Sequence, residues 1–196
     1  MLFRSIIDTG IYAGHSQLNG RVLPGFPGIN DGRGTDDCNG HGTHVAGTVG
    51  GLNSGVASAV KLVPVRVLDC RGSGSWSGVI AGTNWIITYV QDPAFKGKAA
   101  VANMSLGGGV NSSVDQAVKN MILANVTTVV AAGNSSTSAC LSSPADVGEA
   151  IVVGATNSDD SQASYSNSGK CVDIYAPGTN IKSDRKSTRL NSSHEW

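Results

Sequence analysis

The sequence lacks several features that would point to large classes of protein. It has no apolar run of the ~20 residues that a membrane-spanning helix needs, and no excess charge, since 14 Lys and Arg balance 14 Asp and Glu. Aromatic residues make up only 5% of it. The balanced charge argues against a nucleic acid or an anionic membrane as partner. The 196 residues, 26 of them glycine, instead fit one compact domain with close backbone contacts.

The four cysteines, Cys38, Cys70, Cys140 and Cys171, are too widely spaced for the short ligand pairs of a zinc site. Their spacing favours two sequential disulfides, Cys38–Cys70 and Cys140–Cys171, with four buried free thiols as the alternative. Each disulfide would stabilise the fold by ~3–4 kcal/mol on the chain-entropy model. Disulfides indicate an oxidising compartment, so we expect a secreted, extracellular protein. Met1–Asp8 does not resemble a signal peptide, which suggests a fragment.

Strand and helix signals alternate along the middle of the chain. Near-continuous apolar runs predict buried parallel strands, and apolar residues at helical spacing predict the helices between them. The predicted strands are Ala59–Asp69, Ala99–Leu106, Val126–Ala132 and Ala150–Ala155, and the predicted helices are Ser75–Val90 and Ser113–Asn125, the second with Ser113 as N-cap. This order predicts an α/β fold whose ligands bind beyond the carboxyl ends of the strands.

Both ends of the chain differ from this pattern. The first five residues carry no structural signal, and the segment after Ile181 places four basic residues within 15 positions without an apolar period. We therefore expect one domain over residues 6–181, with non-native or artefactual ends at 1–5 and 182–196. A solvated natural tail is the alternative for the second of these segments.

Three short segments carry residues suited to catalysis. Asp8 follows an apolar stretch and precedes a glycine turn. His41 and His44 lie among small residues at the start of a predicted helix. Asn134 follows the end of an apolar strand. His41 is suited to act as a general base, with His44 in a structural role. The uncharged amide of Asn134 is suited to donate a hydrogen bond to an oxyanion. Taken singly, Asp8 and Asn134 could each simply occupy a turn.

Two other enzyme classes fit parts of these segments. The string Asp8-Thr9-Gly10 also suggests an aspartic protease, but that chemistry needs two carboxylates, and a single motif excludes a monomeric one. His41 and His44 could bind a metal in a metallohydrolase. No other histidine has a suitable context to complete such a site, so this class is the least favoured.

Together, Asp8, His41 and Asn134 follow the order found in the subtilisin-like serine proteases. The strings GHGTHVAGT, NMSLGGG and AAGN resemble the motifs of that family. RVLDCRGSGSWSGVIAG and the cysteine positions resemble its proteinase K branch, and within that branch the aqualysin-type bacterial enzymes, which pair their cysteines sequentially. The resemblance covers residues 6–181 and implies a three-layer α/β fold with a mainly parallel twisted sheet flanked by helices, incomplete at the C-terminus.

The resemblance implies a secreted serine endopeptidase, in which Asp8 orients His41, His41 moves the proton of the nucleophile, and Asn134 stabilises the oxyanion. The implied substrate is an extended polypeptide, with an apolar or aromatic residue before the scissile bond. The residues implied to bind it are Gly72, Ser73, Gly74, Trp76, Ser105, Leu106, Gly107, Ala131, Ala132 and Gly133. For Trp76 an ordinary surface position is the alternative. A propeptide would be a partner of the parent enzyme, and we expect a monomer.

A structural Ca²⁺ is also implied by the resemblance, without an organic cofactor. Backbone carbonyls in the segment Pro144–Asp146 and the carboxylate of Asp173 would be its ligands. The residue at Asp146 differs from the usual one in the family, which matters little because the ligand there is a carbonyl. Simple loop packing is the alternative for these residues.

One part of the family pattern does not occur in the sequence. The nucleophile of the family lies in a Gly-Thr-Ser turn that opens a long buried helix, and no such string is present. Ser192 and Ser193 have neither the glycine turn nor a following helix, so we do not assign them this role. We therefore expect an inactive fragment that exposes apolar sheet surface and folds poorly. A non-catalytic peptide-binding protein is the alternative, although it would need none of the three catalytic residues.

Overall fold

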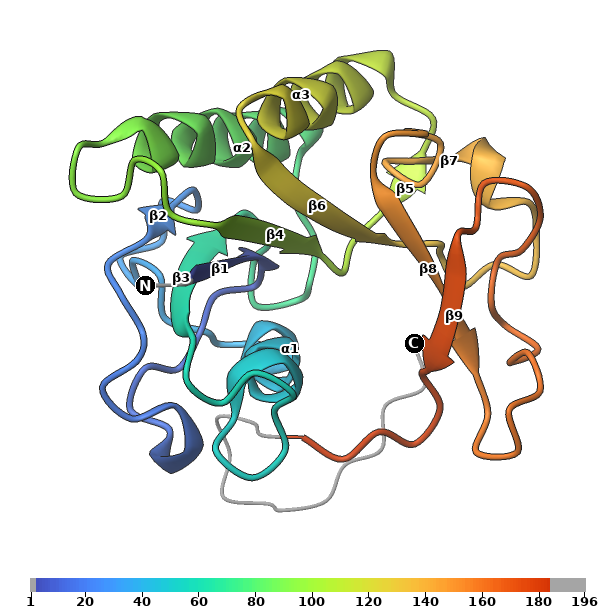
Figure 1. Ribbon diagram of the computed structural model, residues 1–196, viewed down its shortest axis with the longest axis horizontal. Coiled ribbons are helices and arrows are strands. Elements are labelled where there is room, and N and C mark those ends of the chain that lie inside the picture. The colour runs from blue at the N-terminus through green and yellow to red at the C-terminus, as the bar shows by residue number, and fades with distance from the viewer. Residues whose placement is uncertain (1–2, 184–196) are drawn as a thin grey trace.

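The computed structural model describes residues 3–183, in which a central parallel sheet lies between helices (Figure 1). The seven strands of this sheet are all parallel, in the order β2-β3-β1-β4-β6-β8-β9, and a separate two-stranded antiparallel sheet joins β5 to β7. The elements are β1 Phe3–Asp8, η1 Ser16–Leu18, β2 Phe26–Pro27, α1 His41–Gly50, β3 Lys61–Arg66, α2 Trp76–Gln91, β4 Ala100–Met104, β5 Gly108–Gly109, α3 Ser112–Leu123, β6 Val126–Ala131, η2 Ala139–Leu141, β7 Ser142–Ser143, β8 Ile151–Thr156 and β9 Ile174–Pro177.

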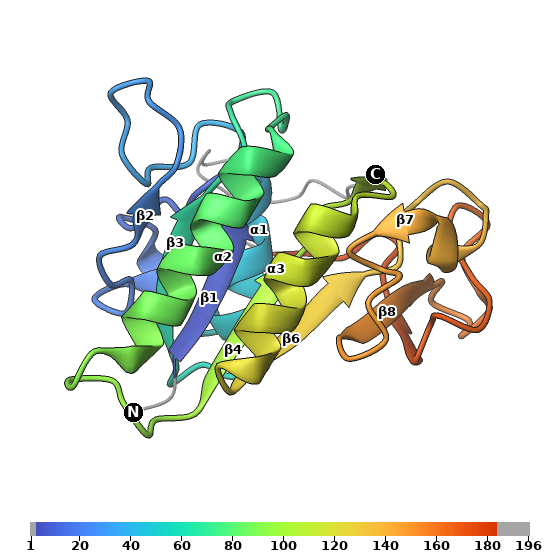
Figure 2. The same ribbon diagram turned by 90° about the horizontal axis from the view of Figure 1, so that it is seen from above.

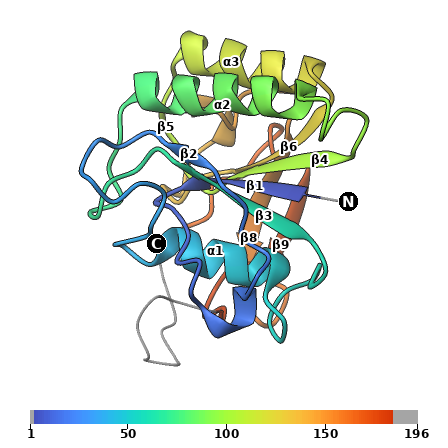
Figure 3. The ribbon, with the colours of Figure 1, turned by 90° about the vertical axis from the view of Figure 1, so that its left-hand side faces the viewer.

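The helices cover the two faces of the sheet unequally. Helices α2 and α3 run side by side across one face (Figure 2), while α1 lies on the opposite face (Figure 3). This arrangement confirms the predicted three-layer α/β fold with a mainly parallel sheet. Within residues 3–183, no helix is long and apolar enough to cross a membrane.

Strand β1 shows why the predicted strands read as continuous apolar runs. Side chains alternate between the two faces of a strand, and at β1 both faces of the sheet are covered. Ile6 packs with Leu62 and Ala46 in the cluster beneath α1, whereas Ile7 packs with Val118 in the cluster beneath α2 and α3. Because both neighbours are fully buried, neither position along the strand can be polar without a partner.

The start of α3 differs from the prediction. The N-cap is Asn111, whose side chain accepts hydrogen bonds from the backbone N–H groups of Ser113 and Val114, so the prediction of Ser113 as the cap was wrong. The N–H of Asn111 donates to the hydroxyl of Ser143 at 2.7 Å. This contact with β7 helps to fix where the helix begins. Ser143 lies 32 residues away from Asn111 in the chain, so no local sequence pattern reveals the contact.

Strand β1 begins at Phe3, inside the segment expected to be non-native. The ring of Phe3 is fully buried and packs edge-on against Tyr89 and Phe95, at centroid distances of 5.7 and 5.6 Å. Phe3–Ser5 therefore take part in the fold. The domain limits at 6 and 181 and the origin of both ends stay predictions, and residues 184–196, including Ser192 and Ser193, lie outside the described residues.

Both predicted disulfides are present. Cys38 is bonded to Cys70 and Cys140 to Cys171, with S–S distances of 2.01 and 2.10 Å. The alternative of four free thiols is therefore wrong. The first disulfide ties the segment that leads into α1 to the loop that follows β3, so the start of α1 is joined covalently to the loop that carries Gly72–Gly74.

Candidate active site

Asp8 and His41 meet at the carboxyl end of the central strand β1. The carboxylate of Asp8 is fully buried, and its Oδ1 lies 2.7 Å from Nδ1 of His41. The backbone N–H of Thr9 donates to the same oxygen, also at 2.7 Å. The side chain of His41 is 22% exposed, so its ring reaches the surface while its partner does not. The pair thus combines a buried, oriented acid with an accessible imidazole, as a general base requires.

Helix α1 begins at His41 without a side-chain cap from its N-cap residue, Gly40. The first backbone N–H groups of the helix instead donate hydrogen bonds to the side chains of three other residues. Asn39 Oδ1 accepts from the N–H of His41, Thr9 Oγ1 from that of Gly42, and Asp37 Oδ2 from that of Thr43, at 3.1, 2.9 and 2.9 Å. The first turn of the helix, which carries His41, is therefore held by residues outside the helix.

Gly42 allows the first turn of α1 to lie directly against the end of β1. A Cβ atom at Gly42 would lie 2.1 Å from the carbonyl oxygen of Gly10, which is a backbone atom. Gly10 itself has a φ of +106°, a conformation that side chains rarely adopt. The glycines of the two motifs are thus what allow Asp8 and His41 to lie within hydrogen-bond distance.

Asn134 follows β6 and lies on the same cleft as His41. The loop that carries it is held by Asn167, whose fully buried side chain donates to the carbonyl of Ala132 at 2.9 Å and accepts from the N–H of Ser135 at 2.9 Å. The backbone N–H of Asn167 also donates to the carbonyl of Gly133. These bonds fix the backbone on both sides of Asn134 and leave its amide exposed toward the cleft.

A cleft of about 870 Å³ runs past these residues. Every residue predicted to bind substrate lines it, together with His41 and Asn134: Gly72, Ser73, Gly74, Trp76, Ser105, Leu106, Gly107, Ala131, Ala132 and Gly133. The loop of Gly72 and Ser73 is held by Asp69, whose carboxylate accepts from the N–H groups of Ser73 and Arg71, and these bonds lower the pKa of Asp69. The structure brings the predicted residues together, while their individual roles stay predictions.

A second cavity of about 430 Å³ lies next to the first, on the α1 side of the sheet. His41 and Asn134 line both cavities. The walls of the second come from His44, Val45 and Val49 of α1 and from apolar residues of β6, β8 and β9. An apolar cavity thus opens beside the imidazole of His41.

The residues predicted to bind calcium have separate hydrogen-bond partners. One carboxylate oxygen of Asp173 accepts from the N–H of Val152 at 2.8 Å. The carbonyl of Pro144 accepts from the N–H of Val147 at 3.1 Å, within the turn that follows β7. Asp146 accepts from Ser143 Oγ at 3.4 Å. Burial raises the pKa of Asp115, and the negative charge of the neighbouring Asp146 raises it further. The exposed carboxylate of Asp173 is chemically suited to Ca²⁺.

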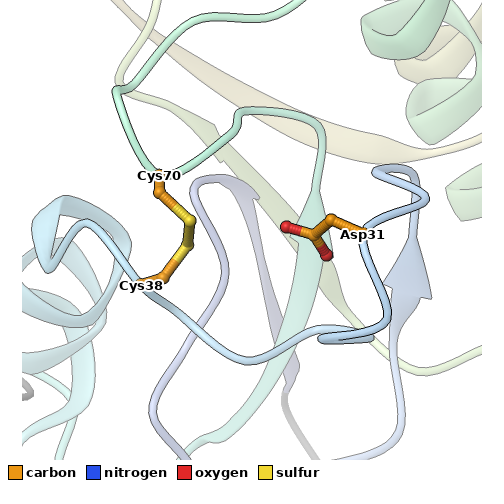
Figure 4. Close-up of side chains that lie close together, drawn as sticks. All are labelled: Asp31, Cys38 and Cys70. Carbon is orange, nitrogen blue, oxygen red and sulfur yellow. A yellow bond between two sulfur atoms is a disulfide. The ribbon is translucent and has the colours of Figure 1, made fainter.

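Asp31, Cys38 and Cys70 form the one group of possible metal-binding side chains within residues 3–183 (Figure 4). The two sulfur atoms are bonded to each other, and both oxygens of Asp31 accept from the guanidinium of Arg66, at 2.8 and 2.7 Å. Their ligand atoms are therefore already engaged. The group is a structural cluster, in which the buried Arg66 also donates to the sulfur of Cys38 at 3.4 Å.

The Arg66–Asp31 pair predicts a loss of stability in acid. The hydrogen bond from Arg66 lowers the pKa of Asp31 from 3.8 to about 2. Since the folded protein binds this proton more weakly than the unfolded chain, the pair stabilises the fold above about pH 4, and the contribution disappears as the pH falls toward 2. Unfolding midpoints in urea between pH 2 and 5 should show this slope, and Asp31→Asn should reduce it. The exposed Asp160→Asn is the control, and an unchanged slope in Asp31→Asn would contradict the assignment.

Three side chains that hold the site through hydrogen bonds were not predicted from the sequence. Thr9 lies inside the Asp-Thr-Gly motif, and Asp37 lies four residues before His41, so a motif signal was close to both. Asn167 lies in no recognised motif. The partners of its side chain are 25 to 35 residues away in the chain, and only the folded structure identifies it.

The family model, the related sequences and a solved structure all indicate the same protein family for this chain. A family described as the Subtilase family, Peptidase S8, matches residues 5–196. The chain is 54% identical over 178 residues to an extracellular serine proteinase of Thermus sp. (strain Rt41A), 49% to alkaline serine exoprotease A of Vibrio alginolyticus, and 50% to proteinase T of Parengyodontium album. Each match covers 91% of this chain but only 42%, 32% and 60% of the relative. A crystal structure of a cold adapted subtilisin-like serine proteinase is similar with a TM-score of 0.86 at 46% identity, covering 94% of this chain and 65% of that one.

Proposed function

Because the chain belongs to the subtilase family, we propose that Asp8, His41 and Asn134 are the acid, the base and the oxyanion-binding group of a serine endopeptidase. The observation that carries the proposal is the 2.7 Å contact between Asp8 Oδ1 and His41 Nδ1 at the edge of a cleft that Asn134 also lines. The intact acid, base and amide favour catalysis over peptide binding alone, because a binding protein needs none of them.

In this proposal, Nε2 of His41 takes the proton of the serine hydroxyl as the oxygen attacks the peptide carbonyl. Asp8 holds the imidazole in the required orientation and stabilises its positive charge. The amide of Asn134 donates to the oxygen that becomes negative in the tetrahedral intermediate. His41 then returns the proton to the leaving amine. Hydrogen bonds with neighbouring residues hold the start of the helix that carries His41 and the loop that carries Asn134.

We propose that the substrate is an extended polypeptide bound along the 870 Å³ cleft. The loop at Gly72–Gly74 and the segment at Ser105–Gly107 would form its two edges, since exposed backbone groups there can pair with a substrate strand. The small residues Ala131, Ala132 and Gly133 would leave room for an apolar or aromatic side chain before the scissile bond. The two disulfides and the extracellular relative from Thermus support a secreted protein, and a propeptide partner stays an expectation.

The nucleophile is proposed to come from a Gly-Thr-Ser turn, which does not occur in the 196 residues. The second cavity supports this part of the proposal, because it lies beside His41 and its lining is largely apolar. A helix that opens with the serine would find both the base and an apolar surface there. The 196-residue polypeptide by itself is accordingly expected to lack hydrolytic activity.

A fluorophosphonate probe and a chromogenic peptide test this proposal together. The 196-residue polypeptide is expected to show neither labelling nor turnover above a heat-denatured sample, because losing the serine lowers kcat about a millionfold in subtilisin. A longer protein that carries this segment and the Gly-Thr-Ser turn is expected to react stoichiometrically at that serine. Stoichiometric labelling of the 196-residue chain would refute the assignment of the nucleophile.

We further propose a structural Ca²⁺ held by the carboxylate of Asp173 and by carbonyls of the Pro144–Asp146 turn. The exposed carboxylate and the oxygen-rich turn support it through their chemistry. Addition of Ca²⁺ after chelation should raise the melting temperature of the protein, with Mg²⁺ as the matched ion. Asp173→Asn should lose that response and Asp160→Asn should keep it. Equal responses in both variants would place the ion elsewhere.

A further inference from the structure

Asp37 is a buried carboxylate that contacts neither the cleft nor a basic side chain in any hydrogen bond of the described residues. Its side chain is fully buried, yet it accepts five hydrogen bonds. Oδ1 accepts from Thr9 Oγ1 and from the N–H groups of Asn39 and Gly40, at 2.9, 2.9 and 2.8 Å. Oδ2 accepts from the N–H and the hydroxyl of Thr43, at 2.9 and 2.6 Å.

The partners of Asp37 lie at the end of β1, which carries Asp8, and around the start of α1, which carries His41. Thr9 directly follows Asp8 at the end of β1, and its N–H donates to the Asp8 carboxylate. Asn39, Gly40 and Thr43 flank His41 on both sides along the chain. The hydroxyl of Thr9 connects the two groups, because it donates to Asp37 while accepting from the N–H of Gly42.

We propose that Asp37 is a positioning residue, which sets the orientation of His41 toward Asp8 by joining the end of β1 to the first turn of α1. Helix capping alone does not explain its contacts, since a cap needs no bond to Thr9 on another element. The five bonds also fix the carboxylate itself, so the connection cannot rotate away when the imidazole changes partners. The inference rests on the proposed roles of Asp8 and His41.

Substitution of Asp37 or Thr9 is expected to loosen the Asp8–His41 contact without unfolding the protein. In Asp37→Asn, an NH₂ group replaces one of the two oxygens and cannot accept, so at least one N–H or hydroxyl loses its partner. Thr9→Val removes only the hydroxyl link and keeps the charge of Asp37. Thr9→Ser restores a hydroxyl at the same place and should rescue the contact.

The direct readout is the NMR signal of the proton shared by His41 Nδ1 and Asp8 Oδ1 in the 196-residue chain with ¹⁵N-labelled histidine. Asp37→Asn and Thr9→Val should speed the exchange of this proton with water about tenfold, since each frees the helix start to open locally. Thr9→Ser and the exposed control Asp160→Asn should leave it unchanged. This readout needs neither a nucleophile nor activity.

Backbone amide spectra of each variant establish that the fold is retained. A folded Asp37→Asn chain whose proton exchanges as in the unsubstituted protein would overturn the inference. If Asp37→Asn does not fold, the comparison of Thr9→Val with Thr9→Ser decides, and equal exchange in these two overturns it as well. If the amide spectrum shows that the unsubstituted chain is folded and the shared-proton signal is still absent, the proposed roles of Asp8 and His41 are overturned, and the inference with them.

Discussion

His41→Ala is expected to lower kcat about a millionfold in a longer protein that joins this chain to its serine nucleophile. In subtilisin, loss of the histidine alone costs about as much as loss of the whole triad, because serine without a base is a weak nucleophile. The peptide should still bind, since the cleft is lined mainly by other residues, so KM should change little. Steady-state kinetics with a chromogenic peptide measure both constants.

His15→Ala is the matched control for this substitution. His15 lies outside the residues that line the cleft, and its ring accepts a hydrogen bond from the N–H of Gln17 at the start of η1. Its loss should leave kcat within about a factor of two, because surface substitutions away from a site change little. A His41→Ala protein that kept a hundredth of the original kcat would show that another group acts as the base.

Gly42→Ala is expected to destabilise the protein by about 3 kcal/mol, at the upper end of the usual cost of overpacking. The added methyl group would lie 2.1 Å from the Gly10 carbonyl oxygen and 3.1 Å from the Gly10 nitrogen. Both are backbone atoms held in the turn after β1, so relief requires the helix start to move away from the strand. The same movement should pull His41 away from Asp8. Chemical denaturation measures the first effect, and the NMR signal of the shared His41 proton measures the second.

Gly148→Ala serves as the control because it adds the same methyl group where no atom lies within 4 Å and φ is not positive. Its free energy of unfolding should stay within about 0.5 kcal/mol of the original. If Gly42→Ala proved as stable as Gly148→Ala, the close packing of α1 on the β1 turn would not be what holds Asp8 and His41 together.

The order and type of the main elements followed from hydrophobic periodicity. Strand β1 is buried on both faces, and its neighbouring residues Ile6 and Ile7 are both apolar. Strands β6 and β8 are also mainly apolar along their length, although only alternate residues of them are fully buried. The short elements were not predicted. β5 is only Gly108–Gly109, and its pairing with Ser142–Ser143 depends on a partner more than 30 residues away. The cap of α3 was missed for the same reason.

The residues proposed to react lie in recognisable motifs, whereas the residues that support them do not. Asp8, His41 and Asn134 lie in motifs whose small residues leave a local signature. Asp37 and Asn167 act through buried hydrogen bonds to backbone groups, and a single Asp or Asn in a loop looks the same whether or not it makes them. The calcium site stays a prediction, because it depends on how two loops lie relative to each other, which no sequence pattern encodes.

The all-parallel sheet has a consequence for how quickly the protein can acquire its catalytic geometry. The central strand β1 pairs with β3 and β4, whose residues lie 58 and 97 positions further along the chain, as in the pairs Phe3–Lys61 and Phe3–Ala100. Strand pairings between such distant residues must first overcome the entropy cost of closing a large loop, and this makes folding slow. The end of β1, which carries Asp8, is therefore fully framed by its neighbours only once these distant strands have paired. If Asp8 and His41 act as proposed, their final geometry would form late in folding.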